Sequence, residues 1–355
     1  MTVERIVTTG EFARIRGEYE KAYASDPWRS VFVSWSWMSA YFRAMRRRWT
    51  LLVARDEGVA CGFCLLIEGG LRIGPARIYR ELALGAYPTA DYTSIVVDPR
   101  REDVVLRAFG EAIGAMEWDV LRASNVRDPR VARLIAIAGV GCEVAELQQN
   151  PAHFVALPAS WPEYVQRLNG GRRYVARRYR TWREARLTEA TDENVDSYIE
   201  TLLELHQRRW NTNIATARRT YGRLFREAYG TGCCRIAVLW SADERPLAAQ
   251  AAFTDAERRS WGVYMLAYDN ERPKGSPGIG MLAKGLELAI EQGYSEYDFL
   301  RGEEPYKSRF GTELRMLENF VAARRTNRRR VAAAAYSCAL GIKAALRRIL
   351  FGRTL

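Results

Sequence analysis

The 355-residue sequence has little histidine and lysine and lacks a long hydrophobic run. Its two histidines, His153 and His206, have no histidine or cysteine partner at ligand spacing, so we expect no metal. No apolar run approaches the ~20 residues that a membrane-spanning helix needs. No Gly-x-Ser-x-Gly elbow is present either. These absences argue against a zinc enzyme, an integral membrane protein and the commonest hydrolases.

The cysteines do not suggest a disulfide framework or a zinc site. Six are present, and Cys61 and Cys64 form a single CxxC in an apolar, strand-like run without a second pair. Buried thiols are therefore expected. The first residues, MTVERIVTTGEFARI, are polar and do not resemble a signal peptide. We expect a cytoplasmic protein with reduced cysteines.

The charge that is present is mostly arginine. The formal net charge is +12, and lysine occurs only at Lys21, Lys274, Lys284, Lys307 and Lys343. GC-rich coding favours arginine and accounts for part of this bias. An excess of guanidinium groups nevertheless favours anionic partners such as phosphates, nucleic acid or an acidic membrane face.

Hydrophobic periodicity and turn residues predict two α+β segments with the same order of elements. Each reads helix, helix, β-hairpin, strand, loop, helix and strand, a weak repeat of about 150 residues. Among the helices we expect 11–24 and 34–48, the latter capped by Ser34 or Ser36. Pro151 and Pro158 place the boundary between the segments near residues 148–160. The predicted organisation is residues 1–155, residues 156–327 and a basic helical tail at 328–355.

The most informative stretch is 297–311, YDFLRGEEPYKSRFG. It begins as a strand after a predicted helix and then becomes a loop that carries five charges beside Tyr306 and Phe310. Loops at strand ends are frequent sites of binding and catalysis, although a solvated turn is the alternative. A second loop, rich in glycine, lies just before the predicted helix that leads into residues 297–311. Glycines and a helix N-terminus suit a pyrophosphate, although a structural turn explains the pattern equally well. The loop consists of Lys274, Gly275, Ser276, Pro277, Gly278, Ile279 and Gly280.

Two further regions are strongly basic. Seven arginines crowd residues 172–186 with Tyr174, Tyr179 and Trp182 among them, a mixture that resembles a nucleic-acid surface. A solvated amphipathic helix with its aromatic rings in the core is the competing interpretation. The tail at 328–355 predicts either contact with an anionic membrane face or packing on the protein.

The run SPGIGMLAKGLELAIEQGYSEYDFLRGEEPYKSRFG resembles the second domain of GNAT-superfamily acyltransferases of the CelD/BcsL type, found with cellulose and exopolysaccharide genes. These are similar in turn to Fem-type peptidyl transferases. The shared pattern is a strand ending in Asp-Phe and a Gly-acidic-x-x-Tyr-Lys-x-x-Phe-Gly segment. It falls here on Asp298, Phe299, Gly302, Glu303, Tyr306, Lys307, Phe310 and Gly311. Weaker likeness, including LLELHQRRW around His206, covers most of residues 30–320.

The resemblance implies two tandem GNAT-like domains and an acyltransferase that moves an acyl group from acetyl-CoA or another acyl-CoA to an amine or hydroxyl. The acceptor would be a small molecule or a glycan precursor. Lys307 would stabilise the developing oxyanion, and Asp298, Glu303 or His206 would orient or deprotonate the acceptor. The loop 274–280 departs from the usual Arg/Gln-x-x-Gly-x-Gly/Ala spacing. An aminoacyl-tRNA or acyl-carrier-protein donor therefore stays open, as does a non-catalytic scaffold at the membrane. We assign substrate binding to Tyr306, Arg309, Gln250 and Tyr264.

Overall fold

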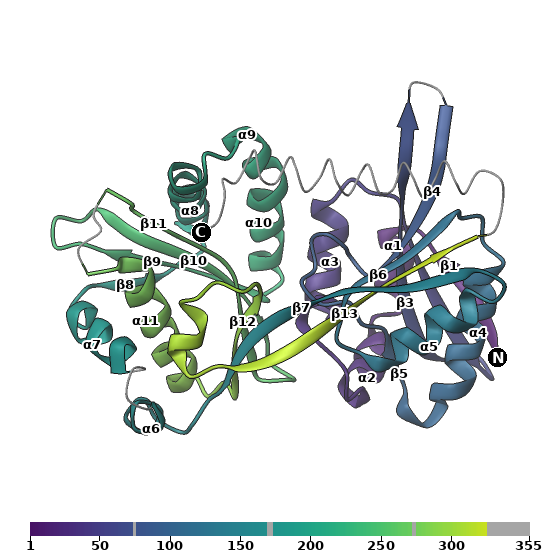
Figure 1. Cartoon of the computed structure of the whole chain (residues 1–355), viewed down its shortest axis with the longest axis horizontal. Coiled ribbons are helices and arrows are strands. Elements are labelled where there is room, and N and C mark those ends of the chain that lie inside the picture. The colour runs from purple at the N-terminus through teal and green to yellow at the C-terminus, as the bar shows by residue number, and fades with distance from the viewer. Residues whose placement is uncertain (74–75, 169–172, 272–274, 325–355) are drawn as a thin grey trace. The chain divides into compact units, whose positions relative to one another are not determined.

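The computed structural model describes residues 1–73, 76–168, 173–271 and 275–324 (Figure 1). These residues form two compact units. Unit 1 contains Met1–Asn150 and the chain that returns at Met316, and unit 2 contains Pro151–Arg315. Lys274 and the predicted basic tail at 328–355 lie outside the described residues.

Unit 1 is a mixed sheet with helices on both faces. The strands lie in the order β1-β2-β3-β4-β6-β13, and only β4 and β6 are parallel. Its elements are β1 (Thr2–Ile6), α1 (Thr9–Arg14), α2 (Arg16–Ser25), α3 (Trp35–Ala44), β2 (Trp49–Asp56), β3 (Val59–Ile73), β4 (Ala76–Leu84), β5 (Val96–Val97), α4 (Glu102–Gly114), β6 (Val120–Val126), α5 (Pro129–Ala138) and the first part of β7 (Glu143–Ala156).

Helices cover both faces of the sheet at β3, which explains why the sequence of this strand is apolar over most of its first half. Gly62 lies under α4, where an added Cβ would approach Val105 Cγ1 to 2.4 Å. The next residue, Phe63, faces the opposite side and contacts Tyr19 of α2, with 4.7 Å between the ring centroids. Because neighbouring residues of a strand point to opposite faces, a strand covered on both sides needs apolar residues throughout.

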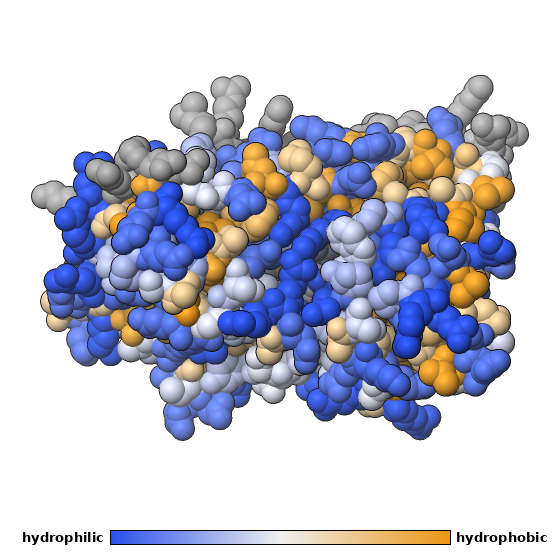
Figure 2. Space-filling view, turned by 90° about the horizontal axis from the view of Figure 1, so that it is seen from below, coloured by the Kyte–Doolittle hydropathy of each residue, from blue (hydrophilic) through white to orange (hydrophobic). Residues whose placement is uncertain are grey.

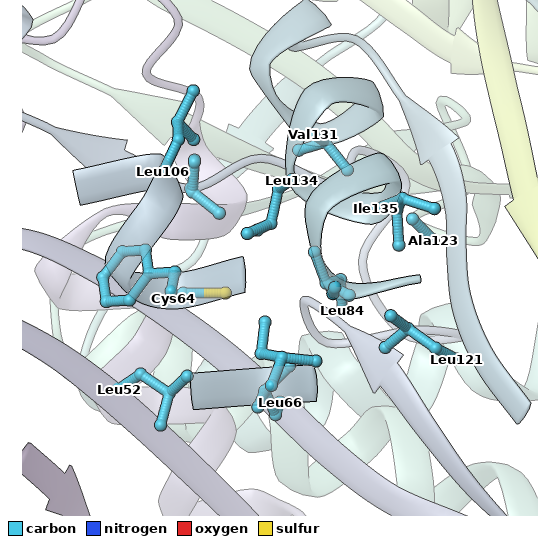
Figure 3. Close-up of a cluster of buried hydrophobic side chains, with 14 of the residues drawn as sticks. Leu52, Cys64, Leu66, Leu84, Leu106, Leu121, Ala123, Val131, Leu134 and Ile135 are labelled. Carbon is cyan, nitrogen blue, oxygen red and sulfur yellow. The ribbon is translucent and has the colours of Figure 1, made fainter. Parts of the chain in front are cut away.

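Cys64 lies in the core between the sheet of unit 1 and the helices α4 and α5. Figure 3 shows it among Leu52, Leu66 and Leu106, and its side chain is fully buried. Burial raises the pKa of the Cys64 thiol to about 12. Cys61 is also buried. The CxxC therefore contributes apolar volume to the core.

Unit 2 repeats this arrangement with the order β7-β12-β11-β10-β9-β8, in which only β11 and β12 are parallel. On β10, Ala252 packs on the α11 side, whereas Phe253 contacts Phe225 of α10 on the other. Its elements are α6 (Trp161–Arg167), α7 (Arg173–Trp182), β8 (Leu187–Glu189), α8 (Val195–Trp210), α9 (Ile214–Ala217), α10 (Arg223–Gly230), β9 (Cys234–Trp240), β10 (Pro246–Asp255), β11 (Ser260–Tyr268), α11 (Pro277–Glu291), β12 (Glu296–Arg301) and the 3-10 turn η5 (Lys307–Phe310). The last strand, β13 (Glu313–Ala323), begins in unit 2 and continues into unit 1.

Two strands carry the chain from one unit to the other. β7 continues through Pro151, and its residues 152–156 pair with β12 of unit 2. β13 leaves unit 2, and its residues 318–323 pair with β6 of unit 1. The described chain thus passes between the units within strands.

Some predicted elements need correction. The expected helix 11–24 is two helices, α1 and α2, which meet at Ile15. The expected helix 34–48 ends at Ala44, although Ser34 caps it as predicted by accepting a hydrogen bond from the Trp37 N–H. The three arginines at 46–48 continued the helical pattern of the sequence, but the chain is extended by Met45, immediately before β2.

None of the helices in the described part of the chain is both long and apolar enough to cross a membrane. On the face that Figure 2 displays, hydrophilic residues predominate and hydrophobic ones are interspersed among them.

Candidate functional site

The parallel strands of unit 2 pair over only three residues and then diverge. Ser260, Trp261 and Gly262 of β11 pair with residues 296–298 of β12. Residues 263–268 of β11 have no strand partner on that side among the described residues. β12 bends where Leu300 adopts a left-handed conformation, with φ of 56°, and its register with β7 shifts between Asp298 and Arg301. The divergence leaves an open backbone edge inside the fold.

A cavity of about 450 Å³ lies against this open edge. β11 supplies Leu266 and Tyr268 to its wall, and the first residues of α11 supply another part. The predicted residues Ser276, Pro277, Gly278, Ile279, Tyr306 and Arg309 all line it. The two loops singled out in the sequence therefore meet at one cavity.

The start of α11 is suited to an anion. Ser276 has φ of 54°, and its carbonyl accepts hydrogen bonds from the N–H groups of Ile279 at 3.0 Å and Gly280 at 3.1 Å. The Tyr174 hydroxyl lies 3.4 Å from Ser276 Oγ. Because a helix N-terminus carries partial positive charge, this end of the cavity would favour phosphate oxygens.

The glycines of this loop have a packing role. An added Cβ at Gly280 would lie 2.3 Å from Trp182 Cδ1, and one at Gly275 would lie 2.8 Å from Trp182 Cζ2. At Gly278 the nearest atom would be Tyr268 Cδ1, at 2.6 Å. The structure thus gives these glycines a second explanation besides ligand approach: they admit the rings of two aromatic side chains.

Two arginines place positive charge on the same cavity. The guanidinium of Arg209 lies 4.2 Å from the ring centroid of Tyr268, and that of Arg309 lies 4.8 Å from the ring centroid of Tyr174. Both contacts are within the range of cation–π interactions. The pKa of Tyr174 is lowered: burial opposes the shift, but the hydrogen bond with Ser276 and the neighbouring Arg178 and Arg309 outweigh it. The wall is therefore both aromatic and cationic.

Tyr306 brings a weakly acidic hydroxyl to the cavity. Burial raises the pKa of this phenol, and the nearby Glu304 carboxylate raises it further. Tyr306 consequently stays protonated at neutral pH, and its hydroxyl can act as a hydrogen-bond donor.

Lys307, the predicted oxyanion stabiliser, is directed toward its own backbone. Its side chain is 3% exposed, and Nζ lies 2.9 Å from Glu304 Oε2. The same ammonium donates to the carbonyl oxygens of Leu300, Arg301 and Gly302, at 3.3, 2.9 and 3.5 Å.

The predicted acids and bases differ in their surroundings. Asp298 is buried, accepting a hydrogen bond from the Leu300 N–H at 2.7 Å and pairing with Arg315 Nη1 at 3.1 Å. Glu303 is exposed on the loop that also carries Tyr306. His206, on α8, does not line the cavity, and its Nδ1 lies 3.3 Å from Thr212 Oγ1. Burial, and secondarily the charge of Arg209, lowers the pKa of His206 to about 4.

Gln250 and Tyr264 also lie away from the lining of the cavity. Gln250 is buried beneath α11, where its Oε1 accepts a hydrogen bond from the Tyr297 hydroxyl at 3.4 Å. Tyr264 packs against Phe253 on the other face of the sheet, with 4.8 Å between ring centroids. Both have contacts typical of the core.

Sequence reasoning missed several cavity residues, among them Tyr174 as a wall residue, Arg209 and Tyr268. Tyr174 had been noticed only within the arginine-rich segment. There, α7 directs its rings inward: the Tyr179 hydroxyl donates to Glu287, and Trp182 Nε1 donates to the Gly275 carbonyl. Those rings do not form an exposed stacking surface.

Unit 2 has a larger cavity as well, of about 760 Å³, whose wall includes Trp182, Trp240 and Glu244. We place the candidate site in the smaller one because it gathers a helix start, two arginines and a tyrosine hydroxyl, and convergent polar groups are typical of ligand sites. Among the described residues, no group of three histidine, cysteine, aspartate or glutamate side chains is arranged to hold a metal.

In unit 1, the parallel strand pair that corresponds to β11 and β12 does not leave an open backbone edge. β4 and β6 also pair in parallel over three residues, 81–83 with 120–122. Beyond them Thr93 forms a parallel bridge with Val126, and its N–H donates to the Asn125 carbonyl at 2.9 Å. The chain itself thus occupies the edge that is open in unit 2.

Comparison with known proteins agrees with this architecture. Residues 166–308 match the family described as acetyltransferase (GNAT) domain. No curated protein matches the sequence. Among solved structures, one described as FemX aligns with a TM-score of 0.62 at 11% identity, over 89% of this chain and 96% of that one.

A tandem GNAT protein from the clavulanic acid biosynthesis pathway aligns with a TM-score of 0.52 at 14% identity, over 90% of this chain and 98% of that one. The C-terminal domain of a putative lysylphosphatidylglycerol synthetase from Agrobacterium fabrum gives 0.54 at 12% identity, over 96% and 98%. The fold is that of a tandem GNAT protein. The residues that match the acetyltransferase (GNAT) domain, 166–308, lie in unit 2, which also contains the cavity at the open edge of β11.

Proposed function

We propose that unit 2 is a GNAT-type acyltransferase that binds an acyl-CoA in the cavity between α11 and the open edge of β11. One observation carries the proposal: the cavity joins an anion-binding helix start to a backbone edge and to Tyr306. The donor's phosphates would lie at residues 276–279 beside Arg209 and Arg309. Its amide-containing arm would pair with β11 as an added strand does.

Transfer to an amine or hydroxyl then follows ordinary acyl chemistry. The acceptor's lone pair forms the new bond at the thioester carbonyl carbon, and the carbon–sulfur bond breaks. The departing sulfur takes the proton of the Tyr306 hydroxyl, which is protonated at neutral pH. The acceptor's own proton passes to a base, for which we favour Glu303. It is exposed on the loop that carries Tyr306, whereas Asp298 is held by Arg315 and His206 lies on α8 outside the cavity lining.

The acceptor that we propose is a sugar or another precursor of a polysaccharide or the cell envelope. The support is the resemblance of residues 276–311 to acyltransferases found with exopolysaccharide genes. The direct test is release of free thiol from acetyl-CoA with a panel of amino sugars, together with calorimetric titration of acetyl-CoA alone.

Arg309→Ala should weaken acetyl-CoA binding about tenfold, because a charge-assisted hydrogen bond is worth roughly 1.5–3 kcal/mol. Arg177→Ala is the matched control, since Arg177 is exposed on α7 and does not line the cavity. Absence of both acetyl-CoA binding and thiol release in the unmodified protein would refute the acyl-CoA donor.

One observation favours a second candidate, a tRNA-dependent aminoacyl transferase. The exposed Arg177 and Arg180 lie on the same helix as Tyr174, whose ring contacts the guanidiniums of Arg178 and Arg309. This basic surface would suit a polyanion longer than coenzyme A. Binding of charged tRNA should then weaken steeply with salt and weaken further in Arg177→Ala/Arg180→Ala. Salt-insensitive binding, or none, would eliminate this candidate.

A further inference from the structure

The end of β12 has an unusual backbone held by an internal cation. Leu300 has φ of 56° and Gly302 has φ of 125°. A left-handed conformation is unfavourable for leucine, so neighbouring contacts must hold it in place. The Gly302 N–H donates to the Pro151 carbonyl at 2.9 Å, which fixes one side of the bend.

Lys307 fixes the other side. The carbonyl oxygens of three successive residues, 300–302, converge on its ammonium group, and Glu304 covers the group from the solvent side. Glu304 reaches this position over Gly302, where an added Cβ would lie within 2.3 Å of Glu304 Oε2. A side chain at residue 302 would displace that carboxylate.

The contacts of Lys307 Nζ are enough to engage all three of its N–H groups. An ammonium has three N–H groups, whereas four acceptor oxygens lie within 3.5 Å of Nζ. The shortest contacts, both 2.9 Å, are to Arg301 O and Glu304 Oε2. With its donors directed at its own loop, Lys307 has none left for a substrate oxyanion in this arrangement.

We propose that Lys307 is a positioning residue: its ammonium holds the end of β12 bent away from β11 and thereby keeps the donor cavity open. β12 departs from β11 immediately after Asp298, and the bend that Lys307 holds begins two residues later. Lys307 also begins the turn η5, which presents Arg309 to the cavity directly after Tyr306. One buried cation thus sets both the open edge and the two side chains opposite it. The cavity's role as a donor site rests on the function proposed above.

Lys307→Met tests the proposal because it keeps the length of the side chain and removes the charge. We expect faster hydrogen exchange of the amides in residues 300–311 and at least a tenfold loss of acetyl-CoA affinity. Lys307→Arg keeps the charge but should show the same faster exchange and the same loss of affinity. A planar guanidinium cannot direct its N–H groups at three oxygens that converge on one atom. Lys284→Met is the matched control: Lys284 Nζ also donates to a backbone carbonyl, that of Arg183 at 2.9 Å, but from an exposed site.

Chemical rescue separates positioning from a general loss of stability. In Lys307→Ala, the converging oxygens should bind ethylammonium, which should return the exchange of residues 300–311 and the acetyl-CoA affinity toward the original values. Tetramethylammonium, which has no N–H, should not. Glu304→Gln provides a milder variant if the lysine variants fail to fold. It should raise exchange in the same residues by a smaller factor.

The outcomes that overturn the proposal are distinct from those that overturn the function. Unchanged exchange in residues 300–311 of Lys307→Met would refute the positioning role. Normal acetyl-CoA affinity with only a lower kcat would instead assign Lys307 to the oxyanion. If the unmodified protein does not bind acetyl-CoA, the proposed donor fails, and exchange and ethylammonium rescue still decide whether Lys307 holds the bend.

Discussion

The indole N–H of Trp182 donates a hydrogen bond to the Gly275 carbonyl over 2.7 Å, joining the end of α7 to the loop that starts α11. The same ring fills the space above Gly280. The position of the proposed phosphate site therefore depends on an aromatic side chain from a helix distant in the sequence.

Gly280→Ala should destabilise the protein by about 1–3 kcal/mol, because the new methyl group would overlap the Trp182 ring and overpacking costs about that much. Urea unfolding measures the change. Gly230→Ala is the matched control, since an added Cβ there meets no atom within 4 Å. Equal stability of the two variants would show that the ring and the glycine do not constrain each other.

Tyr306→Phe should lower kcat about 10²-fold or more, the ordinary contribution of a general acid, with little change in acetyl-CoA affinity. The raised pKa of Tyr306 adds a pH criterion. The phenol stays protonated, so the rate should not decline as pH rises toward about 10, where an unperturbed tyrosine ionises. An unchanged kcat in Tyr306→Phe, or a decline in rate at high pH that persists in this variant, would contradict the assignment.

Stability should decrease with acidification because of His206. Its pKa is about 4 in the folded protein, owing first to burial, against about 6.5 when unfolded. Between these values only the unfolded chain binds the proton, so stability is lost as pH falls through this window, by at most about 3 kcal/mol. His206→Gln should flatten that dependence in urea unfolding at several pH values. An unchanged slope would show that His206 is not the group responsible.

A buried ion cluster in unit 1 should be sensitive to single substitutions. Arg130 Nη2 lies 2.9 Å from Asp26 Oδ2 and 2.8 Å from Asp128 Oδ2, and all three side chains are at most 2% exposed. Asp26→Ala should cost about 3–5 kcal/mol in unfolding free energy, because removing one partner leaves buried charge uncompensated. Glu20→Ala, which breaks the exposed pair with Arg16, should cost less than about 0.5 kcal/mol. Comparable losses would mean that burial does not determine the effect.

The candidate site was partly accessible from the sequence. Residues 276–279, Tyr306 and Arg309 were expected at a ligand, and they line one cavity. Tyr174, Arg209 and Tyr268 were not recognised as wall residues because they come from α7, α8 and β11, and no spacing rule links such distant positions. Gln250 and Tyr264 illustrate the converse: they lie on strands of the same sheet, but Gln250 is buried in the core and Tyr264 packs against Phe253, and neither lines the cavity.

The sequence by itself determined the α+β class, the repeated hairpins and the position of the two loops, because period-two patterns, turn residues and helix caps act over a few neighbouring residues. The tertiary structure alone decided that β13 completes the sheet of unit 1, since strand pairing depends on partners nearly two hundred residues away. It also decided where the charged side chains of residues 297–311 point. Lys307 looked like a group aimed at substrate, but three carbonyls placed around it by the bend of β12 turn its ammonium inward.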